Sequence, residues 1–253
     1  MWQRFRNGIP EYLARHYWWA YLWRPAAWFF DHQPVINLIL FGQYKRLLQH
    51  TLQYLATRPQ GALLQLTCVY GRLTPRVLET NPHADLFLAD VAPLQLDICR
   101  QKLDQTRGRR LHLVRMNAES LAWRSDSFAT ILIFFLLHEM PADARHRTLN
   151  ESLRVLQPSG RLIIAEYGPL PEHHWIYRCT PLRWLLLRLE PFLDGFWRED
   201  LTALLHDAAR TQGKSLHRLS NADCFHGFYR VVSYQLAPGK NTGYNPERTI
   251  LRQ

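Results

Sequence analysis

From residue 62 onward, short apolar runs alternate with stretches patterned like helices, and this alternation restricts the possible folds more than any other feature. The runs that read as strands are Ala62–Val69, Asp85–Ala89, Leu111–Arg115, Phe128–Leu136, Arg161–Ala165 and Phe228–Gln235. The helical stretches are Pro75–Asn81, Pro93–Leu103, Asp143–Leu156 and Arg198–Gln212. Strands that alternate with helices predict an α/β fold, with a mostly parallel sheet covered by helices on both faces.

The end of the first strand is the first place to look for a site, because ligands of open parallel sheets bind outside the carboxyl ends of the strands. This strand leads through Cys68, Val69, Tyr70 and Gly71 towards Thr74. A nucleotide-binding turn here needs small residues, since backbone N–H groups must approach the ligand. Only Gly71 meets that need, so the turn alone fits either an altered cofactor loop or an unrelated turn.

The second predicted strand ends in Asp90, followed by Val91. Asp90 lies 19 positions after Gly71. An acidic residue about 20 positions beyond a glycine turn is placed to accept hydrogen bonds from both hydroxyls of a ribose. The alternative role of Asp90 is to cap the following helix. The spacing favours a contact with a cofactor.

The third and fourth strands end in further polar residues. Asn117, Ala118 and Glu119 follow the third strand, where the Asn117 side chain offers a donor and an acceptor to an adenine edge. His138 and Glu139 follow the fourth, a long apolar run typical of a central parallel strand. A base beside a carboxylate suits proton transfer or metal ligation. The alternative is a packed histidine next to a helix-start charge.

The approach to the fifth strand adds a family resemblance. A helix ending in Val155-Leu156, then Pro158-Ser159-Gly160 and an apolar strand, resembles the matching segment of class I S-adenosylmethionine-dependent methyltransferases. The order of the strand-end residues over 62–167 is also similar to that family. The resemblance implies a Rossmann-like sheet that binds S-adenosylmethionine.

A narrower resemblance covers most of residues 9–236. It is carried by YWWAYL at 17–22, PVINLILFG at 34–42, CVYG at 68–71 and FFLLHE at 134–139. These segments resemble the rhodoquinone biosynthesis proteins, a methyltransferase-like family related to the ubiquinone and menaquinone methyltransferases. The resemblance implies exchange of a ring methoxy group of ubiquinone for an amino group, with S-adenosylmethionine as amino donor and Mn²⁺ as a metal requirement.

The same resemblance suggests roles for individual residues. It places Tyr70 and Gly71 in the altered first loop, Asp90 at the ribose, Asn117 and Ala118 at the adenine, and His138-Glu139 opposite the quinone. We therefore expect cofactor contacts from Cys68, Val69, Tyr70, Gly71, Thr74, Asp90, Val91, Asn117, Ala118 and Glu119, and catalytic roles for Tyr70, His138 and Glu139. The Tyr70 hydroxyl is expected to point towards the sulfonium or the quinone.

One position departs from the narrower family. Arg72 follows Tyr70-Gly71, where that family commonly has an acidic residue. A fixed positive charge repels a divalent cation at close range. Arg72 therefore weakens the aminating prediction, and the sequence does not identify the metal ligands.

The N-terminal segment 1–56 is expected to form a helical cap that is rich in aromatic and basic residues. The chain has nine Trp and a net charge of +10, and Trp mixed with Arg is typical of helices in the membrane interface. No apolar run reaches the roughly 20 residues that cross a bilayer. We predict a cytoplasmic protein held peripherally on the inner face of the membrane, with a membrane quinone and an anionic lipid surface as partners.

The remaining organisation and the alternatives follow from the same features. Residues 57–237 are predicted to form the methyltransferase-like domain, with 169–197 as a lid or insertion and 238–253 as a flexible tail. Three other functions stay open: an ordinary methyltransferase acting on a quinone, phenol or lipid, a binding protein whose catalysis has decayed, and a nucleic-acid methyltransferase. We expect no nucleic-acid partner, because the basic residues are interleaved with Trp and Leu.

Overall fold

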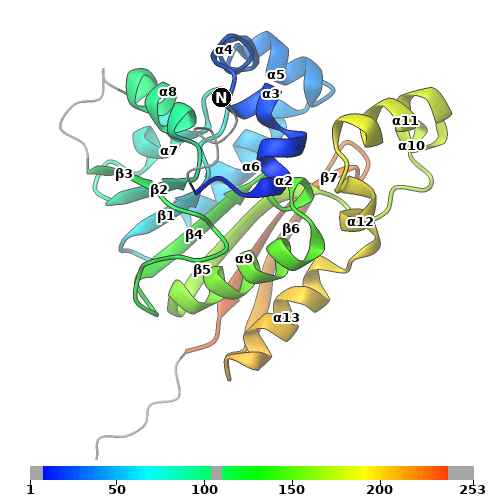
Figure 1. Ribbon diagram of the computed structural model, residues 1–253. Helices are drawn as coiled ribbons and strands as arrows, with labels where there is room; N and C mark the ends of the chain where they lie inside the picture. The colour runs from blue at the N-terminus through cyan, green and yellow to red at the C-terminus, as the bar shows by residue number, and fades with distance from the viewer. Residues whose placement is uncertain (1–7, 104–109, 239–253) are drawn as a thin grey trace, which may run out of the picture.

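A seven-stranded sheet forms the centre of the protein (Figure 1). The computed structural model describes residues 8–103 and 110–238. The strand order is β3-β2-β1-β4-β5-β7-β6, with parallel neighbours from β3 to β5 and with β7 antiparallel to both β5 and β6. The prediction of a mostly parallel sheet is confirmed. The strand order reverses between β1 and β4, and ligands of such sheets bind at this reversal.

The central strands are buried on both faces, which explains their almost continuous apolar sequence. All residues of β1 and β4 are buried, as expected for parallel strands between two helical layers. The strands are β1 (Leu63–Leu66), β2 (Leu86–Asp90), β3 (Leu111–Arg115), β4 (Phe128–Phe134), β5 (Leu156–Tyr167), β6 (Leu216–Cys224) and β7 (Tyr229–Leu236).

One strand, β6, was missing from the sequence prediction. Most of its side chains are exposed or half-buried, because β6 is the edge strand that pairs only with β7. A strand without a buried face carries little apolar signal. β5 also begins earlier than predicted, at Leu156, directly after the preceding helix ends.

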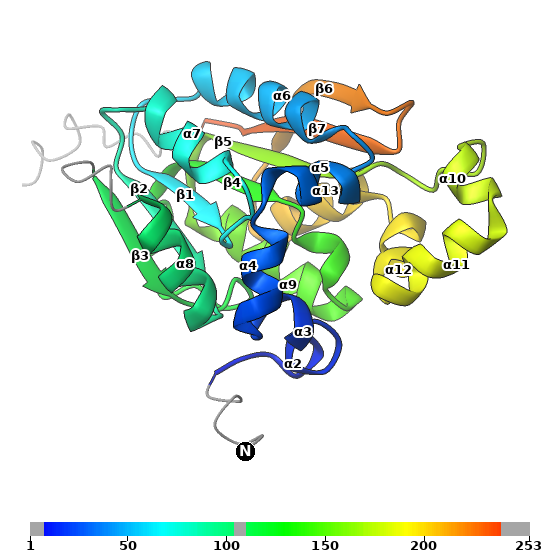
Figure 2. The ribbon, with the colours of Figure 1, turned by 90° about the horizontal axis from the view of Figure 1, so that it is seen from above.

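Helices cover both faces of the sheet (Figure 2). On one face α6 packs against α7, β5 and β7, and on the other α9 packs against α13. The helices after β1 are α7 (Leu73–Thr80), α8 (Pro93–Leu103), α9 (Ala142–Val155), α10 (Trp175–Arg178), α11 (Thr180–Leu189), α12 (Leu193–Arg198) and α13 (Leu201–Thr211). A short 3-10 helix, η2 (Leu137–Glu139), lies between β4 and α9.

The N-terminal region is helical, as predicted. It contains α2 (Glu11–His16), α3 (Trp18–Tyr21), α4 (Arg24–Phe30), α5 (Gln33–Ile39) and α6 (Tyr44–Ala56). Of these, α6 has a continuous buried stripe and belongs to the helical layer of the sheet. The four shorter helices each bury a single alanine or isoleucine, so their stability depends on tertiary contacts.

The segment between β5 and α13 is also built of short helices. No residue of α11 is buried, whereas α12 buries Leu193, Phe196 and Trp197. The predicted tail falls largely on residues 239–253, which lie outside the described part of the chain. Within 8–103 and 110–238, no helix has the length and apolarity needed to cross a membrane.

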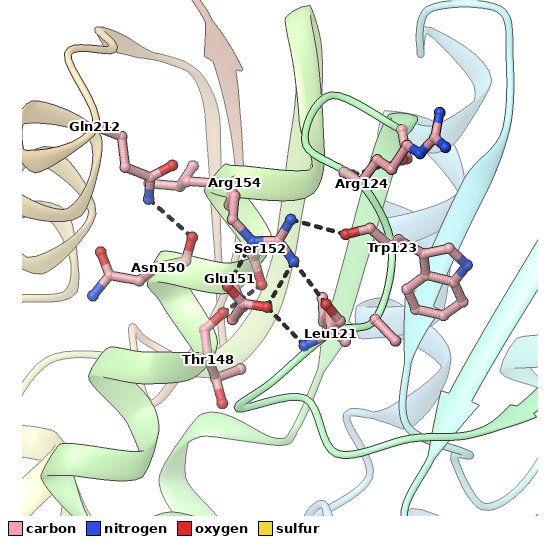
Figure 3. Close-up of polar contacts among 12 residues, drawn as sticks. Leu121, Trp123, Arg124, Thr148, Asn150, Glu151, Ser152, Arg154 and Gln212 are labelled. Carbon is pink, nitrogen blue, oxygen red and sulfur yellow. Dashed lines mark hydrogen bonds and ion pairs between the residues drawn. The ribbon is translucent and has the colours of Figure 1, made fainter.

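A polar cluster holds the segment after β3 against α9 (Figure 3). Arg154 donates to the carbonyls of Leu121 (2.7 Å) and Trp123 (2.8 Å) and pairs with Glu151 at 2.7 Å. Glu151 in turn accepts from the Leu121 amide at 2.7 Å. These contacts satisfy backbone groups that no strand or helix pairs, and they fix the loop that begins at Asn117.

Candidate active site

A cavity of about 410 Å³ lies at the carboxyl ends of β1, β2, β3 and β4. The N-terminal helices form its outer wall, and Leu189 and Glu190 contribute from the end of α11. Most of its wall is apolar. Its size falls within the range of small-molecule sites, and its place at the reversal of strand order matches the expected site.

Most of the predicted site residues come together on this cavity. Those that line it are Cys68, Val69, Tyr70, Asp90, Val91, Asn117, Ala118, His138 and Glu139. Gly71, Thr74 and Glu119 do not line it. Thr74 is buried beside Gln65, which donates to its hydroxyl at 3.0 Å.

Tyr70 differs from the expectation for its hydroxyl. Its ring lines the cavity and stacks on Tyr21, with ring centroids 5.8 Å apart. The hydroxyl donates to the carbonyl of Ala20 and accepts from Gln95 Nε2 at 2.9 Å. It therefore joins the first loop to the N-terminal helices, because both of its hydrogen-bonding roles are taken by protein groups rather than directed at a ligand.

Gly71 is required by the packing of the N-terminal helices. Its φ is +81°, and a Cβ there would lie 2.7 Å from Ile36 Cδ1 and 2.8 Å from the Tyr44 hydroxyl. Its amide donates to Asp31 Oδ1 at 2.9 Å, and Lys102 bridges Asp31 and the Gly71 carbonyl. The sequence suggested that a small residue here lets a ligand approach; the structure brings a helix close instead.

Asp90 lies at the end of β2 with 6% of its surface exposed. Its two carboxylate oxygens accept from the amides of Cys68 (2.7 Å) and Ala92 (2.8 Å). Burial raises its pKa to about 6, although these backbone hydrogen bonds act in the opposite direction. Asp90 thus ties the first loop to the start of α8 while lining the cavity.

Asn117 and Ala118 lie on the cavity wall after β3. The Asn117 side chain accepts from the Glu119 amide at 3.0 Å and donates to the Glu119 carboxylate at 3.4 Å. Glu119 also accepts from Tyr12 and from Arg147. The Asn117 side chain therefore shapes its own loop, and Glu119 braces that loop against α2 and α9.

His138 and Glu139 are surrounded by further acidic groups. His138 Nδ1 lies 2.7 Å from Glu166 Oε1, and His138 Nε2 lies 3.8 Å from Glu190 Oε2. Burial by itself lowers the pKa of His138, but the carboxylates of Glu166, Glu190 and Glu139 outweigh it and raise that pKa to about 9. Burial also raises the pKa of Glu139 and that of Glu190. One imidazole and three carboxyl groups thus form an array in which His138 and Glu166 are buried and Glu139 and Glu190 are half-buried. Of these, His138, Glu139 and Glu190 line the cavity.

Two tyrosines of the N-terminal helices reach the same array. The Tyr21 hydroxyl donates to Glu139 Oε1, and the Tyr17 hydroxyl donates to Glu190 Oε2 at 2.9 Å. Sequence reasoning missed Tyr17, Tyr21, Glu166 and Glu190 as site residues. The position of Glu166 at the end of the fifth strand was the only available signal; the others depend on how two distant segments fold over the sheet edge.

Two non-glycine residues at strand ends take the left-handed conformation. Thr67 has φ 71° and Phe135 has φ 52°, and both line the cavity. Such backbone costs about 1–3 kcal/mol and is enriched at functional sites. Arg72, by contrast, is exposed and does not line the cavity, so its charge does not face the array at His138.

Part of this chain is similar to a known protein family. Residues 63–160, from β1 to the start of β5, match a protein family described as "Methyltransferase domain". The match covers less than half of the chain, and it shows that residues 63–160 are similar to a methyltransferase domain. This finding, the relatives below and the sheet order confirm the prediction of a class I fold and of an S-adenosylmethionine-dependent transferase of the methyltransferase type.

Two curated relatives are named as quinone methyltransferases. The demethylmenaquinone methyltransferase of Thermus thermophilus is 29% identical over 161 residues, which cover 63% of this chain and 70% of that protein. The ubiquinone/menaquinone biosynthesis C-methyltransferase UbiE of Cereibacter sphaeroides is 31% identical over 149 residues, covering 56% of this chain and 58% of that one. The methyltransferase domain is thus related to those of quinone methyltransferases.

Solved structures show the same fold at lower sequence identity. The mitomycin 7-O-methyltransferase MmcR aligns with a TM-score of 0.56 and 18% identity, covering 83% of this chain and 60% of that one. At this identity the likeness concerns the fold, and folds of this kind carry many reactions. The reaction depends on the residues that line the cavity.

Proposed function

We propose that this protein uses S-adenosylmethionine to modify the ring of a membrane quinone. The observation that carries the proposal is the cavity itself: it is largely apolar, with Asp90 and Asn117 on one part of its wall and the array of His138, Glu139 and Glu190 on another. The part of the wall with Asp90 and Asn117 suits a polar cofactor. The apolar part, next to the array, suits a flat quinone ring whose oxygens need hydrogen-bond partners. The names of the curated relatives support the same class of acceptor.

The residues around Asp90 suit the cofactor. The Asp90 carboxylate lines the cavity and is buried, so it would accept hydrogen bonds from ribose hydroxyls in a site largely screened from water. Ala118, 8% exposed, leaves room for a flat base. S-adenosylmethionine supplies the activated group, while Tyr70 and Tyr21 form aromatic wall next to its binding place.

The finer proposal is exchange of a ring methoxy group for an amino group, as in the rhodoquinone family that the sequence resembles. In that exchange an amine nitrogen forms a bond to the ring carbon and loses a proton, the ring C–O bond breaks, and the methoxy group takes up that proton and leaves as methanol. His138 and Glu139 lie on the cavity wall, where they can hold that proton and donate hydrogen bonds to the quinone oxygens. Glu166 keeps the imidazole oriented, since its carboxylate lies 2.7 Å from Nδ1.

The second candidate is methyl transfer to the ring or to one of its oxygens. It is favoured by the relatives, both of which carry the name of a quinone or demethylquinone methyltransferase. Methyl transfer needs the acceptor atom in line with the sulfonium methyl group and a base for the released proton. Glu139 and Glu190 are the carboxylates placed for that role.

One experiment separates these functions. The full chain is expressed in a host that makes ubiquinone but no rhodoquinone, and the quinone pool is analysed by mass spectrometry. Asp97→Asn, at a half-exposed carboxylate, is the control for Asp90→Asn. An amino-quinone that disappears in Asp90→Asn supports the exchange, and a newly methylated quinone supports the second candidate. An unchanged pool, together with binding of S-adenosylhomocysteine by the purified protein, identifies a binding protein without transferase activity and refutes the proposal.

The array also suits a divalent cation. The ligand atoms of His138, Glu139 and Glu190 all lie within 4.8 Å of one another. One imidazole and two carboxylates are a donor set that accepts Mn²⁺ and related ions. When bound, such an ion would polarise a quinone oxygen as a Lewis acid. Binding would require His138 to release its proton, so the metal role and the proton-donor role of His138 exclude each other.

Metal binding has its own test. Equilibrium dialysis against Mn²⁺, followed by elemental analysis, should show about one ion per chain in the wild type and a large loss in Glu190→Gln. Glu172→Gln, on the loop before α10, is the control. Equal Mn²⁺ in the wild type and in Glu190→Gln would rule out this site.

Exposed apolar side chains favour a position on the membrane surface. Ten of the eleven exposed large hydrophobic side chains within residues 8–103 and 110–238 form what we call the aromatic face: Trp18, Trp23, Trp28, Phe29, Leu38, Ile39, Trp175, Trp184, Leu185 and Leu189. The face joins α3–α5 to α10–α11, which lie along the upper side of Figure 1. Phe41, directly after α5, contacts Trp175 with ring centroids 6.4 Å apart.

Basic residues accompany this face. Arg24, Arg178 and Arg188 are exposed on the same helices, as suits anionic lipid headgroups. The fraction of protein that sediments with anionic vesicles should fall strongly in the double variant Trp28→Ser plus Trp184→Ser. The control variant Leu219→Gln, on β6, should sediment like the wild type. A wild-type protein that stays in the supernatant with anionic vesicles would refute peripheral binding to the inner membrane face.

A further inference from the structure

We propose that the hydrocarbon tail of the acceptor leaves the cavity between α5 and α11, through a portal formed by Ile39 and Leu189. The inference rests on the proposed function and deepens it. It states that the acceptor is a tailed ring, bound with its polar head inside and its chain outside, and it identifies the two side chains that the chain passes.

The cavity wall reaches the surface at these two side chains. Among the cavity-lining residues within 8–103 and 110–238, Ile39 (49%) and Leu189 (46%) are exposed, and the others are buried or half-buried. Both are aliphatic side chains that reach the cavity and the solvent at once. Figure 2 shows the helices that carry them, α5 and α11.

The proposed portal is next to the array at His138, because Leu189 precedes Glu190. Glu190 follows Leu189 in the chain; its carboxylate accepts from Tyr17 and lies 3.8 Å from His138 Nε2. A ring with its oxygens on His138 and Glu139 would thus have its tail carbon near Leu189. The carboxylate of Glu190 is turned towards Tyr17 and His138.

The volume of the cavity requires an exit. A cavity of about 410 Å³ is at the lower end of the range for one drug-sized ligand. It cannot enclose a cofactor, a substituted ring and a polyprenyl chain together. A tailed acceptor fits only with its chain outside, and the aliphatic edges of the opening favour hydrocarbon over a polar substituent.

Outside the portal the apolar surface continues. Leu38 on α5 is 77% exposed, and Leu185, one turn before Leu189 on α11, is 47% exposed. Both belong to the aromatic face. A chain leaving the portal would therefore pass over apolar side chains directly into the lipid that this face is proposed to contact, so the head group can enter the site while the tail stays in the bilayer.

The test compares two probes in the purified full chain without vesicles: a tailless dimethoxybenzoquinone, and the same ring with a decyl tail. The tailed ring should bind the wild type more tightly. Leu189→Gln and Ile39→Asn should each weaken the tailed ring about tenfold, because each removes contact with roughly two methylenes. Binding of the tailless ring and of S-adenosylhomocysteine should not change. Leu219→Gln, which alters an exposed leucine on β6 (44%), should behave as the wild type.

The outcomes separate the portal from the function. Equal affinity for both rings in the wild type, or weakening of both rings alike by Leu189→Gln, would overturn the portal. If neither ring binds while S-adenosylhomocysteine does, the quinone function fails and the portal fails with it. As a second readout, a photoreactive group at the end of the decyl tail should label peptides of α5 or α11; labelling of α8 or α9 instead would refute the exit route.

Discussion

Replacing Asp90 by Asn should make the ligand-free protein more stable while it abolishes cofactor binding. Asp90 is buried, lines the cavity and holds the amides of Cys68 and Ala92. Asn has nearly the same shape and no charge. The substitution therefore separates the cost of keeping a carboxylate in this place from the benefit that the carboxylate gives to a ligand.

The magnitude follows from the pKa of Asp90. Burial raises that pKa from 3.8 to about 6, and this difference corresponds to about 3 kcal/mol. Because the folded protein favours the protonated form, the stability contribution of Asp90 is complete below about pH 3.8 and is lost as the pH rises through about 6. Near neutral pH the ionised carboxylate thus costs the folded state about 3 kcal/mol.

Asp90→Asn should remove most of this cost of about 3 kcal/mol. Asn keeps one acceptor oxygen and loses the other, which leaves one amide without its partner and costs about 1 kcal/mol. The free energy of unfolding should therefore rise by about 2 kcal/mol above pH 7. Nearer pH 5 the gain should be about 1 kcal/mol smaller, since wild-type Asp90 is already mostly protonated there.

Urea denaturation at the two pH values measures the stability, and calorimetry with S-adenosylhomocysteine measures binding. Asp97→Asn, at a half-exposed carboxylate on α8 that pairs with Arg100, is the matched control and should change neither free energy by more than about 0.5 kcal/mol. A mutant no more stable than the wild type above pH 7 would show that the buried carboxylate is not strained. Retained affinity for S-adenosylhomocysteine would show that Asp90 does not bind the cofactor.

Three further changes test the framework of the site. Gly71→Ala, at a φ of +81° and against side chains of α5 and α6, should lower the free energy of unfolding by about 2–3 kcal/mol, whereas Gly195→Ala, with open space around it, should cost less than about 0.5 kcal/mol in the same denaturation experiment. Arg154→Met removes the donor to two loop carbonyls and should cost about 2 kcal/mol, with faster hydrogen exchange over residues 116–127. Tyr21→Phe removes a hydrogen bond that lowers the pKa of Glu139, so the pH profile of product formation should move upward; an unmoved profile would exclude Glu139 as the titrating group.

Much of the sheet could be predicted from the sequence. Parallel strands buried on both faces must be apolar throughout, so the runs that became β1, β2 and β4 are visible in one sequence. The edge strand β6 was not, because its side chains face solvent. The strand ends that carry Asp90, Asn117 and His138 were also predictable, since parallel topology brings carboxyl ends to one edge whatever the details of packing.

The chemistry at that edge depends on contacts that no local pattern encodes. Tyr17 and Tyr21 read only as members of an aromatic helix, and Glu190 as the charge after a Leu-rich one. They join His138 and Glu139 because the N-terminal helices and the end of α11 fold over the same end of the sheet. The hydroxyl of Tyr70 faces Ala20 and Gln95 for the same reason.

The sequence by itself determined the class of fold, the edge that holds the site and the carboxylate at the end of β2, because hydrophobic periodicity and strand order are properties of the chain. Only the tertiary structure decided which side chains surround His138, which glycine serves packing rather than a ligand, and where the cavity opens. Those features arise from residues far apart in sequence, as between Tyr17 and Glu190, and such contacts exist only once the sheet and both helical segments have packed together.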